Sequence, residues 1–328
     1  MTDKPRVWVS RPTFPGVIAR LEPHFEVSAE EVERKLSPTE LAARLAGQDA
    51  VIVGLKDRIG AAEVGAAERL RIVANLAVGY DNIDVDAMSA AGIAVSNTAD
   101  VLNESVADFA WAMLLGAARR MTAAERWLRA GQWHATEFKA WLGTDVRGRT
   151  LGILGMGRIG QAIARRAVGF GMPVIYHNRS PLPEADERAC NARHVDKQQL
   201  LGESDFLVLA LPLTARTRHA IAAAELALMK PTAMLINVAR GGIVDDAALI
   251  VALRAQRIAA AGLDVFENEP AFDPAFLDLS NVVLTPHIGS ASAATRRAMA
   301  DRAADNLIAA LTGGSPPDLL NPRTQSKS

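Results

Sequence analysis

The amino-acid sequence predicts an α/β protein made of two Rossmann-like or flavodoxin-like domains, each built around a parallel sheet. Three observations support this fold class. The chain has 328 residues, which is more than a single hydrophobic core usually serves. Short β-branched runs alternate with longer helical segments, as they do in sheets built from βαβ units. A glycine-rich turn at residues 155–160 joins one such strand to a helix.

The first hundred residues contain the strands of one predicted sheet. They are expected at residues 7–10, 50–54, 72–76 and, from a weaker pattern, 93–96. A helix is predicted over residues 37–46, because Ser37 suits the N-cap and Pro38 suits the first turn. Gly47 then ends that helix.

A long apolar helix is predicted next, over residues 101–118. A helix that is apolar on most of its faces is buried, either in a core or in a subunit interface. Asn103, Glu104 and Asp108 interrupt it, and it is too short to span a bilayer.

A second series of strands predicts the other sheet. These strands are expected at residues 150–154, 173–176, 206–209, 234–237, 261–265 and 282–284, with helical segments between them. Residues 291–311 are expected to form a closing helix, and residues 313–328 a frayed polar end.

Composition and charge narrow the class of partners. The formal net charge of −1 gives no electrostatic reason to expect nucleic acid or an anionic membrane surface. The apolar runs are too short for a secretory signal or a membrane span. The single cysteine, Cys190, cannot form a disulfide within the chain, which is compatible with a reducing compartment. We therefore expect a cytoplasmic protein.

The turn Gly155-Met156-Gly157-Arg158-Ile159-Gly160 has the spacing of a dinucleotide-binding fingerprint. Gly155 permits a tight turn, Gly157 lets the backbone approach a pyrophosphate, and Gly160 lets helix and strand pack closely. The N-terminus of the following helix then faces the phosphates. Glycine-rich turns are common, but the strand before this one and the helix and strand after it favour a binding function.

The residues after the next strand predict which nicotinamide cofactor binds. An NAD site has an acidic residue about twenty positions after the glycines. This chain has Asn178, Arg179 and Ser180 there. Asn178 does not repel a 2′-phosphate by charge, and Arg179 and Ser180 can bind one, so we expect NADPH, with NADH used at lower efficiency. The alternative is that Arg179 only points into solvent.

Three later residues, Arg240, Glu269 and His287, follow predicted strands at the edge where open α/β sheets bind ligands. Reduction of a 2-keto acid needs a cation for the carboxylate, which the planar fork of arginine supplies. It also needs a proton donor, which suits histidine, and a neighbouring glutamate would orient the ring. Singly, each residue has an ordinary structural role as an alternative. Together they predict a catalytic site that requires no metal.

With these motifs assembled, the chain resembles the D-2-hydroxyacid dehydrogenase family over nearly its whole length, and within it the glyoxylate/hydroxypyruvate reductases. The matching segments are residues 75–84 (NLAVGYDNID), the glycine turn, 211–214 (LPLT), 237–241 (NVARG), 263–267 (LDVFE) and 286–290 (PHIGS). The chain departs from the common pattern at Asn178, where NAD-using members carry an aspartate. It has a glutamate at position 269, whereas the formate dehydrogenase branch has a glutamine as the partner of the histidine.

The resemblance implies how a substrate would be held. Arg240 would bind the carboxylate and carbonyl of the substrate. His287, hydrogen-bonded to Glu269, would be the general acid in reduction and the base in oxidation. Backbone N–H groups of Val78 and Gly79 would also bind the substrate carboxylate.

The resemblance also implies a set of cofactor contacts. Asp264 would hold the nicotinamide carboxamide, and Ser105 would contact the cofactor at the domain hinge. The further contacts implied, besides the three glycines, are Met156, Arg158, Ile159, Leu211, Pro212, Thr217, Val238, Ala239 and Gly289.

The family's domain arrangement is discontinuous. Residues 1–100 with 290–328 would form the substrate-binding domain and residues 101–289 the dinucleotide-binding domain, with the active-site cleft between them and hinges near 98–102 and 289–291. Family members are usually homodimers, so the apolar helix and the arm-like insertion 131–145, with Trp133 and Trp141, would fit an interface. Trp141 would either shape the partner's substrate pocket or act as a packing anchor.

The activity expected is NADPH-dependent reduction of glyoxylate or hydroxypyruvate to glycolate or D-glycerate. An alternative takes a bulkier 2-keto acid such as phenylpyruvate, and Leu55, in the segment that matches the family's substrate loop, would be one discriminator. A third alternative is a cofactor-sensing binding protein, because transcriptional corepressors share this fold. Those relatives usually carry partner-binding extensions, and this chain has only a short polar tail.

Overall fold

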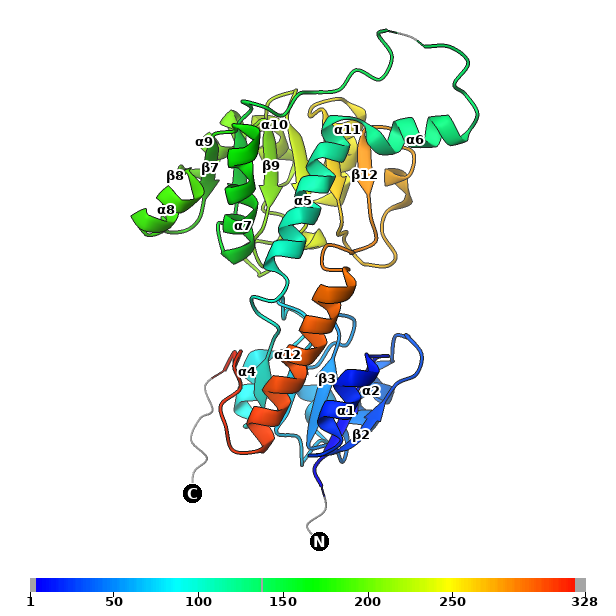
Figure 1. The fold of residues 1–328 in the computed structure, drawn as a ribbon, viewed down its shortest axis with the longest axis vertical. Coiled ribbons are helices and arrows are strands. Elements are labelled where there is room, and N and C mark those ends of the chain that lie inside the picture. The colour runs from blue at the N-terminus through cyan, green and yellow to red at the C-terminus, as the bar shows by residue number, and fades with distance from the viewer. Residues whose placement is uncertain (1–3, 137, 322–328) are drawn as a thin grey trace. The chain divides into compact units, whose positions relative to one another are not determined.

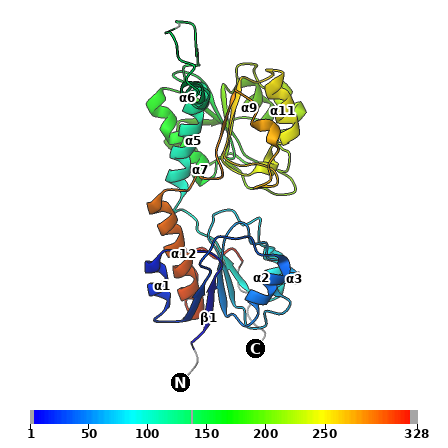
Figure 2. The same ribbon diagram turned by 90° about the vertical axis from the view of Figure 1, so that its right-hand side faces the viewer.

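The chain folds into two compact units in the computed structural model, which describes residues 4–136 and 138–321. Unit 1 is formed by the chain up to Leu102 together with the chain from Ala291 onward, and unit 2 by Asn103–Ser290. Each unit has one parallel sheet with helices on both faces (Figures 1 and 2). The prediction of two parallel-sheet domains is confirmed. The predicted frayed end is wrong for its described last residues, because the Leu320 N–H donates to the carbonyl oxygen of Val95 at 2.8 Å and the buried Asn321 side chain donates to that of Ile93 at 3.0 Å. Residues 322–328 lie outside the described residues.

Unit 1 is built on five parallel strands. They are β1 (Arg6–Val9), β2 (Glu26–Ala29), β3 (Ala50–Val53), β4 (Ile72–Asn75) and β5 (Ala94–Ser96). Their order is β2-β1-β3-β4-β5, so the strand sequence changes direction between β1 and β3, the position where doubly wound sheets bind ligands. Strand β2 has no counterpart in the prediction, because it is a largely exposed edge strand and lacks an apolar run.

Helices cover both faces of the unit 1 sheet. They are α1 (Pro15–Leu21), α2 (Pro38–Leu45), α3 (Ala61–Val64), α4 (Val85–Ala90) and α12 (Ala293–Leu311). Helices α1 and α12 cover one face, while α2 and α3 cover the other (Figure 2). Side chains alternate between the faces, so Val7 and Val9 pack toward α12 whereas Trp8 packs toward α2. Helix α2 begins after Ser37, whose hydroxyl caps the N–H of Glu40 as expected.

Unit 2 is built on seven parallel strands. They are β6 (Leu151–Leu154), β7 (Val174–His177), β8 (Ala192–His194), β9 (Phe206–Leu209), β10 (Met234–Asn237), β11 (Ala260–Leu263) and β12 (Val282–Leu284). Their order is β12-β11-β10-β9-β6-β7-β8, so the switch of direction lies between β6 and β9. Strand β11 ends two residues before its predicted end at 265, because Asp264 is already part of a hydrogen-bonded loop. The short edge strand β8 is a further element that the sequence analysis missed.

Helices also cover both faces of the unit 2 sheet. They are α5 (Asn103–Ala118), α6 (Met121–Arg129), α7 (Arg158–Ala167), α8 (Glu184–Cys190), α9 (Lys197–Glu203), α10 (Ala223–Leu228) and α11 (Asp246–Arg254). Three short 3₁₀ helices are η1 (Val168–Phe170), η2 (Gly241–Ile243) and η3 (Pro274–Phe276). Helices α5 and α7 pack on one face, and α9 and α11 on the other (Figure 2).

The long apolar helix α5 is buried within the core of its own unit. Trp111 stacks on Phe170 with ring centroids 4.4 Å apart, and its Nε1 donates to the carbonyl oxygen of Ile163 at 3.0 Å. The helix begins at Asn103, not at 101, because Asp100 has a left-handed backbone (φ 68°) that breaks the helical path. Among the described residues, no helix has the length and apolar character needed to cross a bilayer.

Candidate active site

The polar residues singled out in unit 2 gather past the carboxyl ends of its strands. The glycine turn follows β6, Asn178 follows β7, Arg240 follows β10, Asp264 follows β11 and His287 follows β12. Because all seven strands are parallel, these ends share one edge of the sheet. The glycine turn lies at the switch of direction between β6 and β9, which is the usual place of a dinucleotide.

The glycine turn has the geometry that a dinucleotide requires. Gly155 has φ +99°, and a Cβ there would lie 2.7 Å from the backbone of Ala210. A Cβ on Gly160 would lie 2.4 Å from the carbonyl oxygen of Gly155, so the close approach of α7 to β6 needs a glycine. A Cβ on Gly157, in contrast, would meet no described atom within 4 Å. The backbone at the start of α7 therefore borders open space, which fits a pyrophosphate.

Asn178 joins the end of β7 to the glycine turn. Its Oδ1 accepts a hydrogen bond from the N–H of Met156 at 2.7 Å, and its carbonyl oxygen lies 3.1 Å from Nε2 of His194. Arg179 and Ser180 are exposed, and their side chains make no hydrogen bond or ion pair with residues 4–136 or 138–321. A cation and a hydroxyl are thus available beside the turn.

His287 and Glu269 form a hydrogen-bonded pair, as the sequence predicts. Nδ1 of His287 lies 2.8 Å from Oε2 of Glu269. The two side chains are 30% and 34% exposed, so a small molecule can reach them. Because the carboxylate occupies Nδ1, Nε2 is the ring nitrogen that can meet a substrate.

Glu269 is held as a carboxylate. Burial raises its pKa, but the hydrogen bond and charge of His287, the N–H of Phe266 at 2.9 Å and the charge of Arg240 outweigh burial and lower the pKa of Glu269. An ionised Glu269 accepts hydrogen bonds only, so the proton between Oε2 and Nδ1 resides on the ring.

Asp264 holds the loop that carries His287. Its carboxylate accepts hydrogen bonds from the hydroxyl of Thr285 at 2.7 Å and from the N–H groups of Ile288 and Gly289 at 2.8 Å each. Burial raises the pKa of Asp264, although these donors oppose that rise. His287 itself has φ +55°, a conformation that is strained in a residue with a side chain and that clusters at functional sites. The sequence motifs do not reveal this positioning role of Asp264.

Arg240 lies close to the Glu269 loop because of the glycine that follows it. A Cβ on Gly241 would lie 1.9 Å from the carbonyl carbon of Phe266, so only glycine allows the two loops to meet. The side-chain amide of Asn237 donates to the carbonyl oxygen of Arg240 at 2.9 Å and shapes this strand end. The structure thus brings the charge of Arg240 near the Glu269–His287 pair.

The other expected cofactor contacts lie in loops at the same edge. Leu211 and Pro212 follow β9, and Val238 and Ala239 follow β10. The hydroxyl of Thr217 donates to the carbonyl oxygen of Pro212 at 2.7 Å and folds the loop after β9 back on itself. Ser105 Oγ donates to the carbonyl oxygen of Gly289 at 3.4 Å, which joins the start of α5 to the His287 loop.

Three of the predicted substrate contacts belong to unit 1 instead. Leu55 lies in the turn after β3, and Val78 and Gly79 lie in the loop after β4. All three residues are half-buried. They share the carboxyl edge of the unit 1 sheet, as parallel strands require.

A second charged cluster, which no sequence motif predicts, surrounds Glu267. Glu267 accepts hydrogen bonds from His219 at 2.9 Å and Arg218 at 3.0 Å, and its N–H donates to Asp246 at 2.9 Å. Burial, together with the charges of Glu267 and two further aspartates, raises the pKa of Asp246 to about 6. The contacts join the loops after β9 and β11 to the first residue of α11, and no sequence spacing could reveal them.

Trp141 packs within its own chain. Its ring lies 5.4 Å from that of Trp127, and the guanidinium of Arg120 lies 5.1 Å from its centroid. That Trp141 shapes a partner's substrate pocket stays a prediction.

Known proteins resemble this chain over nearly all of its length. A glyoxylate reductase of Thermococcus gammatolerans is 49% identical over 323 residues, which cover 97% of this chain and 96% of that protein. The solved structure of an NADPH-dependent glyoxylate/hydroxypyruvate reductase from Sinorhizobium meliloti, in complex with NADP and malonate, has a TM-score of 0.86 and 39% identity, covering 97% of each chain. That of a glyoxylate reductase from Paecilomyes thermophila has a TM-score of 0.88 and 34% identity, covering 98% of this chain and 99% of that one.

The family model of the D-isomer specific 2-hydroxyacid dehydrogenase NAD-binding domain matches residues 111–289, which include the glycine turn and all three residues Arg240, Glu269 and His287. The resemblance read from the sequence is confirmed. The chain is a member of the D-isomer specific 2-hydroxyacid dehydrogenases, enzymes that use a nicotinamide cofactor.

Proposed function

We propose that this enzyme is an NADPH-preferring reductase of glyoxylate and hydroxypyruvate, with glycolate and D-glycerate as products. The observation that carries the proposal is the His287–Glu269 pair at 2.8 Å, near Arg240 and at the same sheet edge as the glycine turn. The names of the relatives from Thermococcus gammatolerans and Sinorhizobium meliloti support the substrate class.

The proposed mechanism assigns one task to each side chain. The chemistry that a bound reduced nicotinamide supplies is hydride donation to the carbonyl carbon. Arg240 binds the substrate carboxylate and polarises the carbonyl through its planar fork of N–H donors. His287 donates the proton on Nε2 to the carbonyl oxygen as charge develops there. Glu269 keeps Nδ1 protonated and fixes the plane of the ring, since its hydrogen bond leaves only Nε2 facing outward.

The proposed preference for NADPH rests on the three residues that follow β7, residues 178–180. A carboxylate at position 178 would repel a 2′-phosphate, whereas the amide of Asn178 is neutral. Arg179 and Ser180 are exposed there without partners in the described chain, and both suit a phosphate. The NADP complex of the Sinorhizobium meliloti relative supports this choice.

The variant Asn178→Asp tests the preference. An aspartate oxygen can still accept the N–H of Met156, so the turn is kept while one negative charge is added. With glyoxylate as substrate, we expect kcat/KM for NADPH to fall at least about tenfold and that for NADH to rise or stay constant, because like charges repel. An unchanged ratio of the two values would show that residue 178 does not face the 2′-position. Asn191→Asp, in the turn after α8, is the matched control.

We further propose that the enzyme is a homodimer that uses α6 and the arm after it. Met121, Leu128, Trp133 and Leu142 are exposed large apolar side chains on these segments, and such groupings mark interaction surfaces. Light scattering after gel filtration should give twice the chain mass of 35.0 kDa. Leu128→Glu should produce monomers, while Val251→Glu, which replaces an exposed apolar side chain on α11, should not. A monomeric wild type would contradict the proposal.

A further inference from the structure

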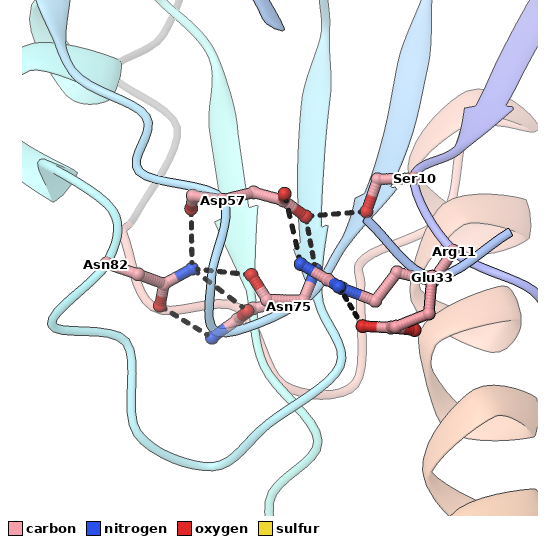
Figure 3. A network of polar contacts seen from close by, with 7 residues as sticks. Ser10, Arg11, Glu33, Asp57, Asn75 and Asn82 are labelled. Carbon is pink, nitrogen blue, oxygen red and sulfur yellow. Dashed lines mark hydrogen bonds and ion pairs between the residues drawn. The ribbon is translucent and has the colours of Figure 1, made fainter. Parts of the chain in front are cut away.

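A buried polar network occupies the switch of direction in the unit 1 sheet. Its centre is Asp57, which is 3% exposed and lies just after β3 (Figure 3). The Asp57 carboxylate accepts hydrogen bonds from Ser10 Oγ at 2.6 Å, from the N–H of Gly54 at 2.9 Å and from the guanidinium of Arg11 at 3.1 Å. A buried carboxylate with this many donors is compensated, and its partners are held in fixed positions.

Arg11 balances the charge of this network. Its guanidinium also pairs with Glu33, so one cation lies between two carboxylates (Figure 3). A Cβ on Gly54 would lie 1.9 Å from Nε of Arg11, so the side chain passes directly over that glycine. The N–H of Asp57 donates to the carbonyl oxygen of Gly54 at 3.0 Å, which closes a tight turn with Leu55 at its tip.

Two asparagines extend the network to the neighbouring loop. Asn82 donates to the carbonyl oxygens of Asp57 at 3.0 Å and of Gly54 at 3.2 Å, and its amide lies against that of Asn75 (Figure 3). Asn75 in turn donates to the carbonyl oxygen of Gly79 at 2.8 Å. The turn after β3 and the loop after β4 are therefore joined by buried amide contacts.

In the loop after β4, the carbonyl oxygens of Ala77 and Val78 accept hydrogen bonds from other residues of unit 1. Thr98 N–H donates to the carbonyl oxygen of Ala77 at 3.1 Å, and Asn97 Nδ2 to that of Val78 at 2.8 Å. The N–H groups of Val78 and Gly79 make no hydrogen bond to any described residue. In a planar trans peptide the C=O and N–H point in opposite directions. Holding the carbonyl oxygens of Ala77 and Val78 inward therefore turns the N–H groups of Val78 and Gly79 outward.

We propose that Asn97 and Asn75 are positioning residues for the substrate carboxylate, and that Asn82 and the Asp57 network hold Asn75 in place. Two adjacent outward N–H groups form a donor pair that suits a carboxylate. Asn97 sets the peptide that carries the Gly79 N–H, and Asn75 fixes the next peptide in the loop. This inference rests on the proposed function, because a 2-keto acid supplies the carboxylate.

The variants Asn97→Asp and Asn75→Asp test the inference in the full-length enzyme. Each keeps the size of the side chain but replaces the amide donor by an oxygen, so the carbonyl group is released and the loop peptide turns. We expect the KM for glyoxylate to rise about tenfold or more, with kcat reduced less and the KM for NADPH changed less than about twofold. Asn97→Ala, which removes the donor without adding charge, is the second variant should the aspartates fold poorly.

Asn321→Asp is the matched control in the same unit. Asn321 is also buried and donates to a backbone carbonyl oxygen, that of Ile93, but its hydrogen bonds go to Ser89, Ile93 and Val95 and not to the loop after β4. It should lower Tm like the other variants and leave the KM for glyoxylate unchanged. If Asn97→Asp and Asn75→Asp lower Tm and also leave that KM unchanged, their role is merely structural and the inference is overturned.

A binding experiment separates this inference from the proposed function. Oxalate, a non-reducible dicarboxylate, is titrated into ¹⁵N-labelled enzyme with NADP present, and the amide signals of Val78 and Gly79 are followed. We expect both signals to shift, with Kd raised about tenfold by Asn97→Asp. Should the wild type reduce no keto acid while these shifts occur, the proposed function fails and the inference holds. Absence of the shifts in an enzyme that reduces glyoxylate overturns the inference alone.

Discussion

The pair formed by His287 and Glu269 is positioned by contacts that each have a clear physical purpose. Glu269 stays ionised because the ring, the Phe266 N–H and the charge of Arg240 stabilise its carboxylate against the effect of burial. Asp264 keeps His287 in a left-handed backbone conformation by holding the residues that follow it. Such strain persists only where surrounding contacts determine it, and it is frequent where a side chain must point at a ligand.

Replacement of the histidine tests its proposed role directly. We expect His287→Ala to lower kcat for glyoxylate by roughly 10²- to 10⁴-fold, the usual contribution of general acid catalysis. The KM for NADPH should stay close to the wild-type value, because Nε2 is proposed to face the substrate. Steady-state kinetics measure both quantities, and a variant with wild-type kcat would exclude His287 as the proton donor. His24→Ala, in unit 1, is the control for a histidine remote in the sequence from the site.

The connection from β6 to α7 shows how one turn combines two demands. Gly155 and Gly160 are glycines because of close approaches within the protein, whereas Gly157 borders open space. Gly155 and Gly160 are therefore needed for folding, whereas Gly157 leaves space for a bound cofactor. The glycine spacing in the sequence reflects both demands and does not separate them.

Three alanine variants separate them by experiment. Gly157→Ala should leave Tm nearly unchanged but raise the KM for NADPH at least about tenfold, since its methyl group enters the space proposed for the pyrophosphate. Gly160→Ala should lower the free energy of unfolding by about 1–3 kcal/mol, because its Cβ meets the Gly155 carbonyl oxygen. Gly169→Ala in η1, where a Cβ meets nothing within 4 Å, should change neither property. The idea fails if Gly157→Ala binds NADPH as the wild type does.

Helix α11 begins at Asp246, a buried carboxyl group with other carboxylates nearby. Burial, and then the charges of Glu267, Asp245 and Asp273, raise the pKa of Asp246 from 3.8 to about 6, although the N–H of Glu267 opposes the rise. The folded protein thus binds this proton more tightly than the unfolded chain. The free energy of unfolding contributed by Asp246 is then highest below its unfolded pKa and falls as pH rises toward 6.

Removal of the Asp246 charge should stabilise the folded enzyme at pH values above about 6. Asp246→Asn keeps an oxygen to accept the N–H of Glu267 and has no titrating group. We expect it to gain on the order of 2–3 kcal/mol over the wild type at about pH 8 and much less at about pH 4. Urea unfolding of both proteins across this range measures the difference, and a gain independent of pH would contradict the assignment. Asp245→Asn, which removes the N-cap side-chain charge of the same helix, is the comparison.

The two sheets were largely predictable because buried parallel strands leave short apolar runs in the sequence. Strands β3, β4, β6, β9 and β10 are buried at every position, and each coincides with a predicted run. The edge strands β2 and β8 lack such runs and were missed. Helix α5 begins two residues later than predicted, because Asp100 before it has a left-handed backbone. Strand β11 ends two residues earlier than predicted, because Asp264 hydrogen-bonds to the loop that carries His287.

Site residues that directly follow strands could be predicted from the sequence. Contacts between different loops could not. Arg240, Glu269 and His287 stand out because polar residues interrupt apolar runs at strand ends, and the pairing of Glu269 with His287 is confirmed. The Glu267 cluster and the contacts of Asn82 with the turn after β3 join segments through tertiary packing, which leaves no periodic pattern. For the same reason the positioning role of Asp264 emerged only from the folded chain.

The most direct test of the proposed function is the ratio of kcat/KM values for glyoxylate and hydroxypyruvate with NADPH and with NADH, measured on the wild-type enzyme beside phenylpyruvate as a bulkier substrate. We predict that the two small keto acids are reduced best and that NADPH is preferred by at least about tenfold, an advantage of about 1.4 kcal/mol. A tenfold or larger preference for NADH, or no oxidation of either cofactor by the two small keto acids, would contradict the proposed function.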